Sequence, residues 1–339
     1  MTEALLEVRN LKVYYNTERG TVRAVDDISF NLPLGQNLAL VGESGCGKTT
    51  VAKAILHLLA DNASIRGGEI IFKGQRIDSL SEKEFDKLRW NEIAVISQSA
   101  MNALNPVYRV GDQIIEAIEA HQKIDRKSAR EKVRRLFQWV GLAPERARDF
   151  PHQFSGGMKQ RAIIAMSLAL NPSLIIADEP TTALDVVMQD QVMEQIVHIQ
   201  KESDSSILMI SHDISVVTEV CQYFVVMYAG KVVEACTVEN FHNMPCHPYS
   251  MGLLLAFPTL EGEARRLISI PGFPPDLSRQ IDGCIFYDRC PFRKTICQNE
   301  TPPNVEVGPG HLAKCHFAHQ AEQLRPVSQK EETWEPIMA

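Results

Sequence analysis

Short apolar runs alternate with longer stretches of helical periodicity along residues 1–235. Within this part Val133, Leu136, Phe137 and Val140 recur at helical spacing, and Gly141 follows as a C-terminal cap. A further helix is expected over 51–59. The apolar runs of strand length cover 5–8, 24–32, 37–41, 69–73, 93–96, 174–177, 207–210 and 223–228. Buried strands separated by helices predict an α/β fold with a mostly parallel sheet covered on both faces.

The character of the chain changes after Glu234. A stretch rich in proline and glycine at 271–275 separates the body from a cysteine-bearing segment. The last residues, 321–339, carry several glutamates and little apolar periodicity, so we expect a loosely ordered end. The predicted domains are therefore 1–235, with a helical subdomain at about 99–160, then an extension at 236–320 and a flexible tail.

Composition narrows the range of functions. The chain has 339 residues and a formal net charge of −7, which removes the electrostatic reason to expect generic nucleic-acid binding. No apolar run approaches the ~20 residues that cross a bilayer. The N-terminus lacks a basic segment followed by an apolar stretch, so we expect a cytoplasmic protein.

One strand leads directly into a phosphate-binding sequence. The run at 38–41 is followed by the pattern G-x-x-x-x-G-K-[ST], the order in which a strand enters a loop that opens a helix. Glycines let backbone N–H groups surround phosphates, a lysine neutralises them and a threonine hydroxyl can hold Mg²⁺. The residues expected to contact ATP here are Gly42, Glu43, Ser44, Gly45, Cys46, Gly47, Lys48, Thr49 and Thr50.

Two acids end a second apolar strand at 174–177. Asp178 is placed to bind Mg²⁺, directly or through water, and Glu179 to polarise an attacking water. Paired acids at a strand end are often only solvated surface. The lysine–threonine loop needs such a partner, which favours the functional interpretation.

These motifs, together with Ser155-Gly156-Gly157 and the run 154–161, resemble the ATP-binding-cassette (ABC) ATPases. The order of the motifs along residues 1–235 also matches that family. The resemblance implies a P-loop NTPase cassette with an N-terminal antiparallel β part and a helical subdomain, and ATP and Mg²⁺ as ligands.

The resemblance also assigns individual roles. Tyr15 is expected to stack on adenine, with Tyr14 as the neighbouring candidate. Glu179 acts as general base, and His212 holds the γ-phosphate. Gln98 contacts Mg²⁺ or the attacking water, so that Thr49, Gln98 and Asp178 form the Mg²⁺ set.

A second cassette completes the site in this family. The residues Ser155, Gly156, Gly157 and Met158 engage the γ-phosphate bound to the opposite subunit, and Ala183-Leu184-Asp185 is the D-loop. A glycine-rich helix N-terminus offering amides and a hydroxyl to an anion supports this role. The family commonly has Gln at the position of Met158, which is a small departure.

Four cysteines lie close together in the extension. Cys284, Cys290, Cys297 and Cys315 follow one another with five, six and seventeen residues between them. Such density in a cytosolic chain favours a shared metal over free thiols. Zn²⁺ and a [4Fe–4S] cluster both accept four thiolates. The resemblance favours the cluster. His311, His316 and His319 are close enough in sequence to serve as substitute ligands, but we expect them to be solvated instead.

The extension after residue 236, including the structural His247-Pro248-Tyr249, resembles that of ATP-binding subunits in oligopeptide/dipeptide importers. This resemblance implies an ATPase that powers peptide import from the cytoplasmic face of the membrane. Its partners are a second, homologous but distinct ATPase subunit, two transmembrane permease subunits and, indirectly, a substrate-binding protein. Nickel, glutathione or oligosaccharides remain alternative cargoes, and a soluble non-transport ABC ATPase is the alternative class.

Overall fold

The computed structural model describes residues 4–97, 103–181, 189–190, 192–194, 196–197, 200, 205–256 and 267–335. The chain forms two compact units that interleave in sequence. The first contains residues 1–5, 33–36 and 80–209, and the second contains 6–32, 37–79 and 210–339. We describe each unit by itself.

The second unit holds a small antiparallel sheet and most of a larger mixed sheet. In the small sheet β1 lies between β2 and β4, and β4 also pairs with the short β5. Its strands are β1 (Ala4–Thr17), β2 (Gly20–Pro33), β4 (Ala63–Phe72) and β5 (Gln75–Arg76). Because β1 and β4 run antiparallel, the predicted antiparallel β part is confirmed.

The larger sheet of this unit is organised around β9 (Tyr223–Tyr228). On one side β3 (Asn37–Val41) pairs with it in parallel, and on the other β10 (Lys231–Thr237) pairs antiparallel. β12 (His311–Ala313) extends β10, and β11 (Val305–Gly308) pairs with β12. The extension therefore continues the sheet of the cassette.

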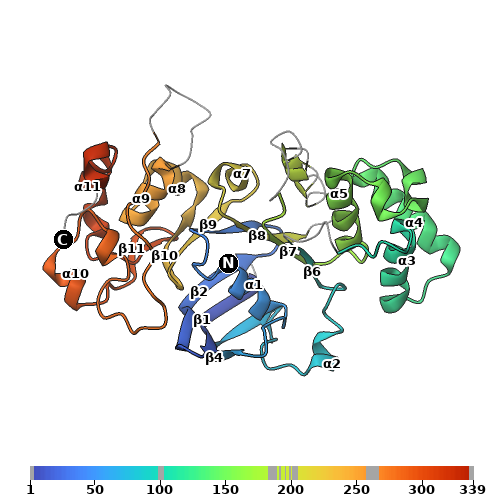
Figure 1. The fold of residues 1–339 in the computed structure, drawn as a ribbon, viewed down its shortest axis with the longest axis horizontal. Helices are drawn as coiled ribbons and strands as arrows, with labels where there is room; N and C mark the ends of the chain where they lie inside the picture. Colours follow the sequence, from blue (N-terminus) through green and yellow to red (C-terminus); the bar gives the residue numbers. More distant parts are fainter. Residues whose placement is uncertain are drawn as a thin grey trace. The chain divides into compact units, whose positions relative to one another are not determined.

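Short helices surround this sheet in the second unit. In Figure 1, α8 and α9 lie beside β9 and β10, and α11 lies at the end of the chain. The helices are α1 (Lys48–Ile55), α7 (Ile214–Thr218), α8 (Val238–Asn243), α9 (Pro248–Leu255), η4 (Tyr287–Arg289), α10 (Thr295–Asn299), η5 (Ala318–Gln320), α11 (Ala321–Ser328) and η6 (Glu331–Trp334).

The first unit combines a parallel strand pair with a helical region. β6 (Ile93–Ile96) and β7 (Leu174–Asp178) pair in parallel, and β8 (Ser206–Ser211) begins in this unit. The helices α3, α4 and α5 pack together, as Figure 1 shows. The helices and turns are α2 (Glu82–Phe85), α3 (Val110–His121), α4 (Arg126–Trp139), η2 (Pro144–Arg148), η3 (Pro151–Gln153) and α5 (Gly156–Ser167).

Local chemistry explains the helices of the first unit. The Asp125 carboxylate accepts hydrogen bonds from the backbone N–H groups of Lys127 and Ser128, which caps α4. Its apolar stripe, including Val133, Leu136 and Phe137, is buried. The helical spacing expected for Val133, Leu136 and Phe137 is therefore confirmed, and these residues lie in α4.

The end of the chain differs from the expectation of a flexible tail over 321–339. Residues 321–328 form α11, and Trp334 is buried. The indole Nε1–H of Trp334 donates to the carbonyl oxygen of Ser328 at 2.7 Å. An aromatic side chain that packs on the extension supplies the stabilisation that α11, with Pro326 inside it, lacks by itself. Residues 336–339 lie outside the described part.

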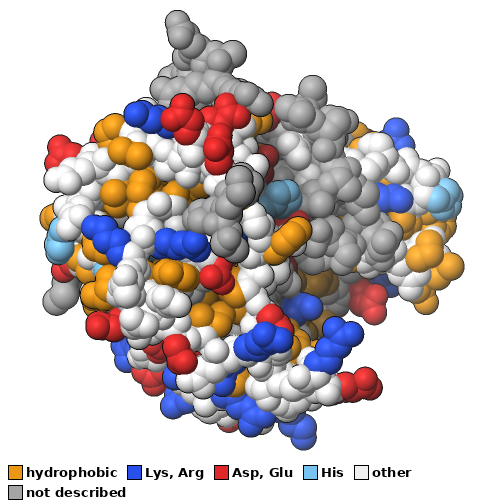
Figure 2. All heavy atoms as spheres, turned by 60° about the vertical axis from the view of Figure 1, so that its left-hand side comes forward, with side chains coloured by type: hydrophobic (Ala, Val, Ile, Leu, Met, Phe, Trp, Pro, Cys, Tyr) orange, Lys and Arg blue, Asp and Glu red, His pale blue; other side chains and the backbone are white. Residues whose placement is uncertain are grey.

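None of the helices described is both long and apolar enough to cross a lipid bilayer. Acidic and basic side chains both appear on the face drawn in Figure 2, with apolar side chains between them.

Candidate nucleotide site and cysteine site

The phosphate loop connects β3 to α1 in the second unit. Gly42 and Gly47 have φ values of 147° and 107°, which favour glycine. A Cβ on Gly42 would lie 2.1 Å from the Met227 carbonyl oxygen, and one on Gly47 would lie 2.3 Å from that of Ala24. Both glycines are therefore required by backbone conformation and by the strands that flank the loop.

Lys48 folds over its own loop. Its ammonium donates to the carbonyl oxygens of Gly42 at 2.7 Å and Glu43 at 3.0 Å, and it lies 3.7 Å from the Cys46 sulfur. Burial raises the pKa of the Cys46 thiol, although the Lys48 charge opposes the shift. Cys46 is thus a buried packing residue beneath the lysine. Thr49, Ser44 and Gly45 are exposed.

Two tyrosines precede the loop on β1. The Tyr14 hydroxyl donates to the Asp26 carboxylate at 2.8 Å, and burial together with this bond raises the pKa of Tyr14 to about 12. The Tyr15 hydroxyl lies 3.4 Å from the Thr50 hydroxyl, at the first turn of α1. Tyr15 is therefore the one of the two that contacts the helix opened by the loop.

The acidic pair ends β7 in the first unit. Asp178 is the last residue of the strand, and Glu179 follows with φ of 49°, an uncommon value for a residue with a side chain. Such strain is concentrated at functional sites. Both carboxylates are partly exposed.

The helix that carries Ser155 lies in the same unit. The Ser155 hydroxyl accepts a hydrogen bond from the Met158 backbone N–H at 3.3 Å and caps α5. Ser155 is exposed, Gly156 and Met158 are partly exposed, and Gly157 is buried. The N-terminus of α5 therefore faces solvent, where a second molecule can reach it.

One residue of this helix was not singled out by the sequence patterns. The Gln160 side chain is buried and donates to the Pro180 carbonyl oxygen at 2.7 Å. It thereby ties α5 to the segment that directly follows Asp178 and Glu179. The sequence could have pointed to this residue, because a glutamine among apolar positions on the inner face of a helix indicates a buried hydrogen bond.

His212 directly follows β8 and is exposed in the second unit. Gln98 and the D-loop Ala183-Leu184-Asp185 lie outside the described residues.

The phosphate loop is also held by the extension. The backbone N–H of Glu43 donates to the Tyr249 hydroxyl at 2.8 Å. The Glu43 carboxylate accepts two hydrogen bonds from the Arg289 guanidinium, at 2.7 and 2.9 Å. Burial lowers the pKa of Arg289, but its hydrogen bonds to Glu43 and Tyr228 outweigh burial and raise the pKa above its usual value. These two contacts join residues separated by more than two hundred positions.

The four cysteines of the extension converge. Cys284, Cys290, Cys297 and Cys315 line one small pocket together with Phe286, Phe292, Phe317 and His316. Burial raises the pKa of Cys284 to about 11 and that of Cys315 to about 12, and neighbouring thiolates add to both shifts. Thiols whose ionisation is disfavoured in this way, at Cys284, Cys290 and Cys315, fit a shared cation, which deprotonates its thiol ligands.

Backbone N–H groups donate hydrogen bonds to sulfur atoms of this site, as is common for thiolates that bind metals. The Phe317 backbone N–H donates to the Cys315 sulfur at 3.4 Å, and backbone N–H groups also bond Cys284 and Cys290. Among the described residues no three of the four sulfurs lie within 4.8 Å of one another. A tetrahedral zinc site with Zn–S of about 2.3 Å has sulfurs roughly 3.8 Å apart. Among the described residues the four sulfurs are therefore not drawn together as closely as the ligands of such a site.

Three histidines were named as substitute ligands. His316 lines the pocket, and its Nε2 lies 2.9 Å from the Glu300 carbonyl oxygen. His319 is exposed. His311 is buried, contrary to the expectation of a solvated side chain, because its Nε2 lies 2.7 Å from the Glu234 carboxylate.

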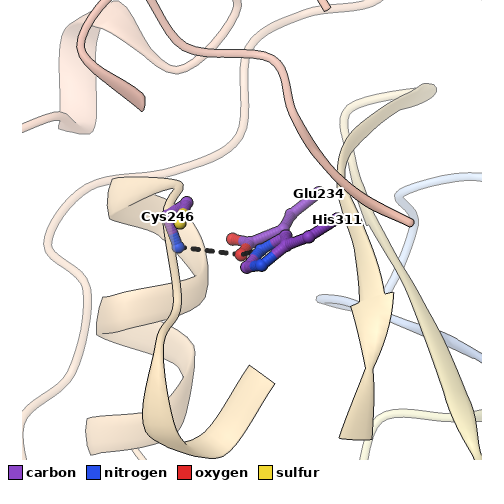
Figure 3. Close-up of side chains that lie close together, drawn as sticks. All are labelled: Glu234, Cys246 and His311. Carbon is purple, nitrogen blue, oxygen red and sulfur yellow. Dashed lines mark hydrogen bonds and ion pairs between the residues drawn. The ribbon is translucent and has the colours of Figure 1, made fainter. Parts of the chain in front are cut away.

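Glu234, Cys246 and His311 form a second buried group, drawn in Figure 3. The Glu234 carboxylate accepts hydrogen bonds from the backbone N–H groups of Cys246 and His247, both at 2.8 Å, besides its contact with His311. The Cys246 thiol is directed to the Met244 carbonyl oxygen. Because these contacts satisfy the carboxylate, we interpret the group as a tie between β10, the start of α9 and β12.

The fold and the phosphate loop define an ATP-binding cassette. The chain matches the family model "ABC transporter" over residues 25–182 and "Oligopeptide/dipeptide transporter, C-terminal region" over 233–297. Solved structures with similar folds include cbiO1 of Clostridium perfringens, part of the ABC transporter complex cbiONQ (28% identity, 72% of this chain and 92% of that chain, TM-score 0.63). A dimeric ATP-binding cassette, MJ0796, shares the fold at 24% identity and a TM-score of 0.62, over 69% of this chain and 98% of its own.

Curated relatives extend the match to nearly the whole chain. The dipeptide transport ATP-binding protein DppD of Lactococcus lactis is 46% identical over 92% of this chain and 90% of its own length. The oligopeptide transport ATP-binding protein OppD of Escherichia coli is 44% identical over 92% and 93%. This chain belongs to the family of ATP-binding proteins of dipeptide and oligopeptide ABC transporters. It is therefore an ABC-type ATPase.

Proposed function

We propose that this chain hydrolyses ATP to power the import of peptides through an ABC transporter. The observation that carries the proposal is similarity at 43–46% identity, over more than nine-tenths of the chain, to proteins named for dipeptide and oligopeptide transport. The match to the C-terminal region of such transporters adds to it. We take peptides, rather than nickel, glutathione or oligosaccharides, as the cargo class on this ground. A soluble ABC ATPase without a transporter has no observation in its favour.

In the proposed mechanism, ATP is bound by the phosphate loop, and Lys48 neutralises its outer phosphates. Thr49 and Asp178 would hold Mg²⁺ together with Gln98, and that ion would neutralise charge on the β- and γ-phosphates. Tyr15 stacks on adenine, since Tyr14 is engaged by Asp26.

Hydrolysis needs a base and a group for the γ-phosphate. Glu179 accepts the proton of the attacking water, and His212 donates to the γ-phosphate. The strained backbone at Glu179 supports a functional role for this side chain.

A second cassette completes the site. Ser155, Gly156 and Gly157, with Met158, contact the γ-phosphate of ATP bound to a homologous but distinct partner subunit, and residues 183–185 are proposed as the D-loop. The exposed N-terminus of α5 supports this assignment. Hydrolysis divides the bridging nucleotide into two anions, so the dimer opens. This cycle drives two transmembrane permease subunits, which receive peptide from a substrate-binding protein. In this proposal the chain is bound at the cytoplasmic face of the membrane.

We further propose a [4Fe–4S] cluster on Cys284, Cys290, Cys297 and Cys315. The convergence of the four cysteines on one pocket supports a shared group, the N–H···S contact at Cys315 suits a thiolate ligand, and the family resemblance favours the cluster over Zn²⁺. The group would connect short segments that have little core of their own. Iron and zinc content of the purified chain decide between the two metals.

The Glu179→Gln variant tests the catalytic assignment. It is expected to retain ATP binding and to lower the rate of phosphate release by about 10²-fold or more, because the amide cannot accept the proton. Glu322→Gln, an exposed substitution on α11, is the control. A Glu179→Gln rate near that of the wild type would refute Glu179 as base.

Growth of the source cells tests the cargo. Cells that require one amino acid and lack this chain are expected not to grow when that amino acid is supplied only as a dipeptide. The wild-type chain restores growth and Glu179→Gln does not. Normal dipeptide growth without the chain, combined with loss of nickel uptake, would contradict peptide transport and leave the ATPase assignment intact.

A further inference from the structure

The phosphate loop and the cysteine site are joined by one buried residue. Arg289 is the last residue of η4 and directly precedes Cys290. Its side chain is 5% exposed and forms the two-bonded ion pair with Glu43, the second residue of the phosphate loop. A ligand position of the cysteine site is therefore one peptide bond away from the cation that grips the loop.

The geometry of Arg289 is fixed on all sides. Its guanidinium also donates to the carbonyl oxygens of Pro271 at 2.8 Å and Ile270 at 3.2 Å. It lies over the ring of Tyr228, 5.6 Å from the ring centre. Because these contacts orient the planar fork, the guanidinium presents a fixed pair of donors to Glu43.

A layer of aromatic rings fills the space between the two sites. The ring centres of Tyr228 and Tyr249 are 4.7 Å apart, and Phe286 packs against both at 5.1 and 5.5 Å. Phe286 lines the cysteine pocket, whereas the Tyr249 hydroxyl receives the Glu43 backbone N–H. The loop is thus held at one residue through both its backbone and its carboxylate.

The ion pair with Arg289 compensates the charge of the Glu43 carboxylate. A carboxylate inside a loop that binds phosphates repels the triphosphate unless it is neutralised or directed away. Arg289 does both, because its fork fixes the carboxylate and supplies the opposite charge. Without Arg289, the negative charge of Glu43 would act unpaired on the bound phosphates.

We propose that Arg289 and Tyr249 are positioning residues for the nucleotide site, and that the group bound by the four cysteines sets the ATP affinity through Arg289. The proposal rests on ATP binding at the phosphate loop and, for its second half, on the metal group proposed above. In a chain that loses the group, the 284–290 segment relaxes, Arg289 releases Glu43, and ATP binds less tightly.

The first test measures binding of a fluorescent ATP analogue, with Mg²⁺, to the full-length chain. Arg289→Gln is expected to weaken binding by about tenfold, since it leaves the Glu43 charge unpaired. It should raise KM for ATP more than it lowers kcat. Arg289→Lys should lie between, because it keeps the charge and loses the fork. Arg293→Gln, in the same segment but over Tyr287 rather than Glu43, is the matched control.

The double variant separates positioning from a purely structural role. Glu43→Gln removes the unpaired charge, so Arg289→Gln combined with Glu43→Gln should regain much of the affinity that Arg289→Gln loses. If the double variant binds more weakly still, Arg289 acts only by supporting the fold and the proposal is wrong. If the wild type does not bind nucleotide, the proposed function fails instead.

Tyr249→Phe tests the second contact. It removes only the hydroxyl that accepts the Glu43 N–H, and a several-fold weaker binding is expected. Tyr287→Phe, which has no contact with the loop in the described structure, should bind as the wild type does. Equal binding by the two variants would remove Tyr249 from the proposal.

The last test follows the metal. Iron is removed from wild type and from Arg289→Gln with a chelator, and nucleotide affinity is measured before and after, with circular dichroism to confirm folding. Wild type should lose affinity several-fold, whereas Arg289→Gln should change little because the connection is already broken. An equal loss in both chains, or no loss in wild type, overturns the coupling. A preparation with neither iron nor zinc overturns its metal half, while the Arg289 and Glu43 variants still decide the positioning role.

Discussion

The phosphate loop and the cysteine site achieve rigidity by different means. The loop is one contiguous stretch, and its shape is fixed by glycine conformations and by close approach of neighbouring carbonyl groups. The cysteine site is assembled from residues that are far apart in the sequence, from His247 to Phe317, and backbone hydrogen bonds such as that from the Cys284 N–H to the Cys297 carbonyl oxygen, at 2.7 Å, join its parts. A contiguous site is recognisable from a short motif, whereas a site assembled from distant residues is readily coupled to its surroundings. Arg289 provides such a coupling between the two.

The comparison predicts that the loop tolerates no added side chain. Gly42→Ala places a methyl group 2.1 Å from the Met227 carbonyl oxygen at a φ of 147°. We expect loss of nucleotide binding and destabilisation by about 3 kcal/mol or more, from steric overlap and backbone strain together. Nucleotide titration and thermal unfolding measure both effects.

Gly74→Ala is the matched control for this prediction. Its φ of 76° is also positive, but no atom lies within 4 Å of the added carbon. Strain alone should cost about 1–2 kcal/mol, with nucleotide binding retained. Equal binding by Gly42→Ala and Gly74→Ala would show that the loop is not backbone-limited.

The cysteine site, in contrast to the phosphate loop, should be disrupted by removing one metal ligand rather than by adding a side chain. Cys290→Ser is expected to lower the metal content and to destabilise the extension by a few kcal/mol, because binding energy contributes to folding. Elemental analysis, absorption spectra and limited proteolysis of the extension report these changes.

Cys221→Ser provides the control, because Cys221 is equally buried and lies outside the cysteine pocket. It should cost stability through a buried hydroxyl but leave the metal content unchanged. If both variants keep the metal, the four cysteines are only packing residues.

The same contrast explains what the sequence could predict. Asn37–Val41, Ile93–Ile96 and Tyr223–Tyr228 were expected as strands with the bounds they have, because fully buried strands are apolar throughout. The phosphate loop followed from its contiguous pattern, and the resemblance supplied the family, which the comparisons confirm.

Long-range contacts escaped prediction. Glu43 and Arg289 are 246 positions apart, and no periodicity connects a loop glutamate with an arginine beside a cysteine. The order of residues 321–335 was missed for a related reason, since it depends on Trp334 packing against Gly252. The pairing of β12 with β10 likewise makes the extension part of the compact unit that holds the phosphate loop. The domain boundary at 235 stays a prediction.

The smallest effect on stability is expected for a side-chain network within the cassette, centred on Asp26. The Asp26 carboxylate accepts hydrogen bonds from Lys231 at 2.9 Å and from Tyr14 at 2.8 Å. Burial raises the pKa of Asp26, but these two bonds outweigh it and hold the pKa below its ordinary value. The unfolded chain therefore takes up the proton at higher pH than the folded chain.

This link contributes stability that is fully present above the unfolded pKa and is lost as the pH falls through the lower folded value. Asp26→Asn should remove at most about 1 kcal/mol at pH 7, since the pair is partly exposed. The difference from wild type should shrink when urea unfolding is repeated near pH 3.5, while Asp61→Asn, an exposed substitution, serves as control. A difference that stays constant with pH would mean that Asp26 acts by packing rather than by charge. In that case the region around Asp26 would be stabilised as the phosphate loop is, by backbone conformation and packing, and not by contacts between charged side chains.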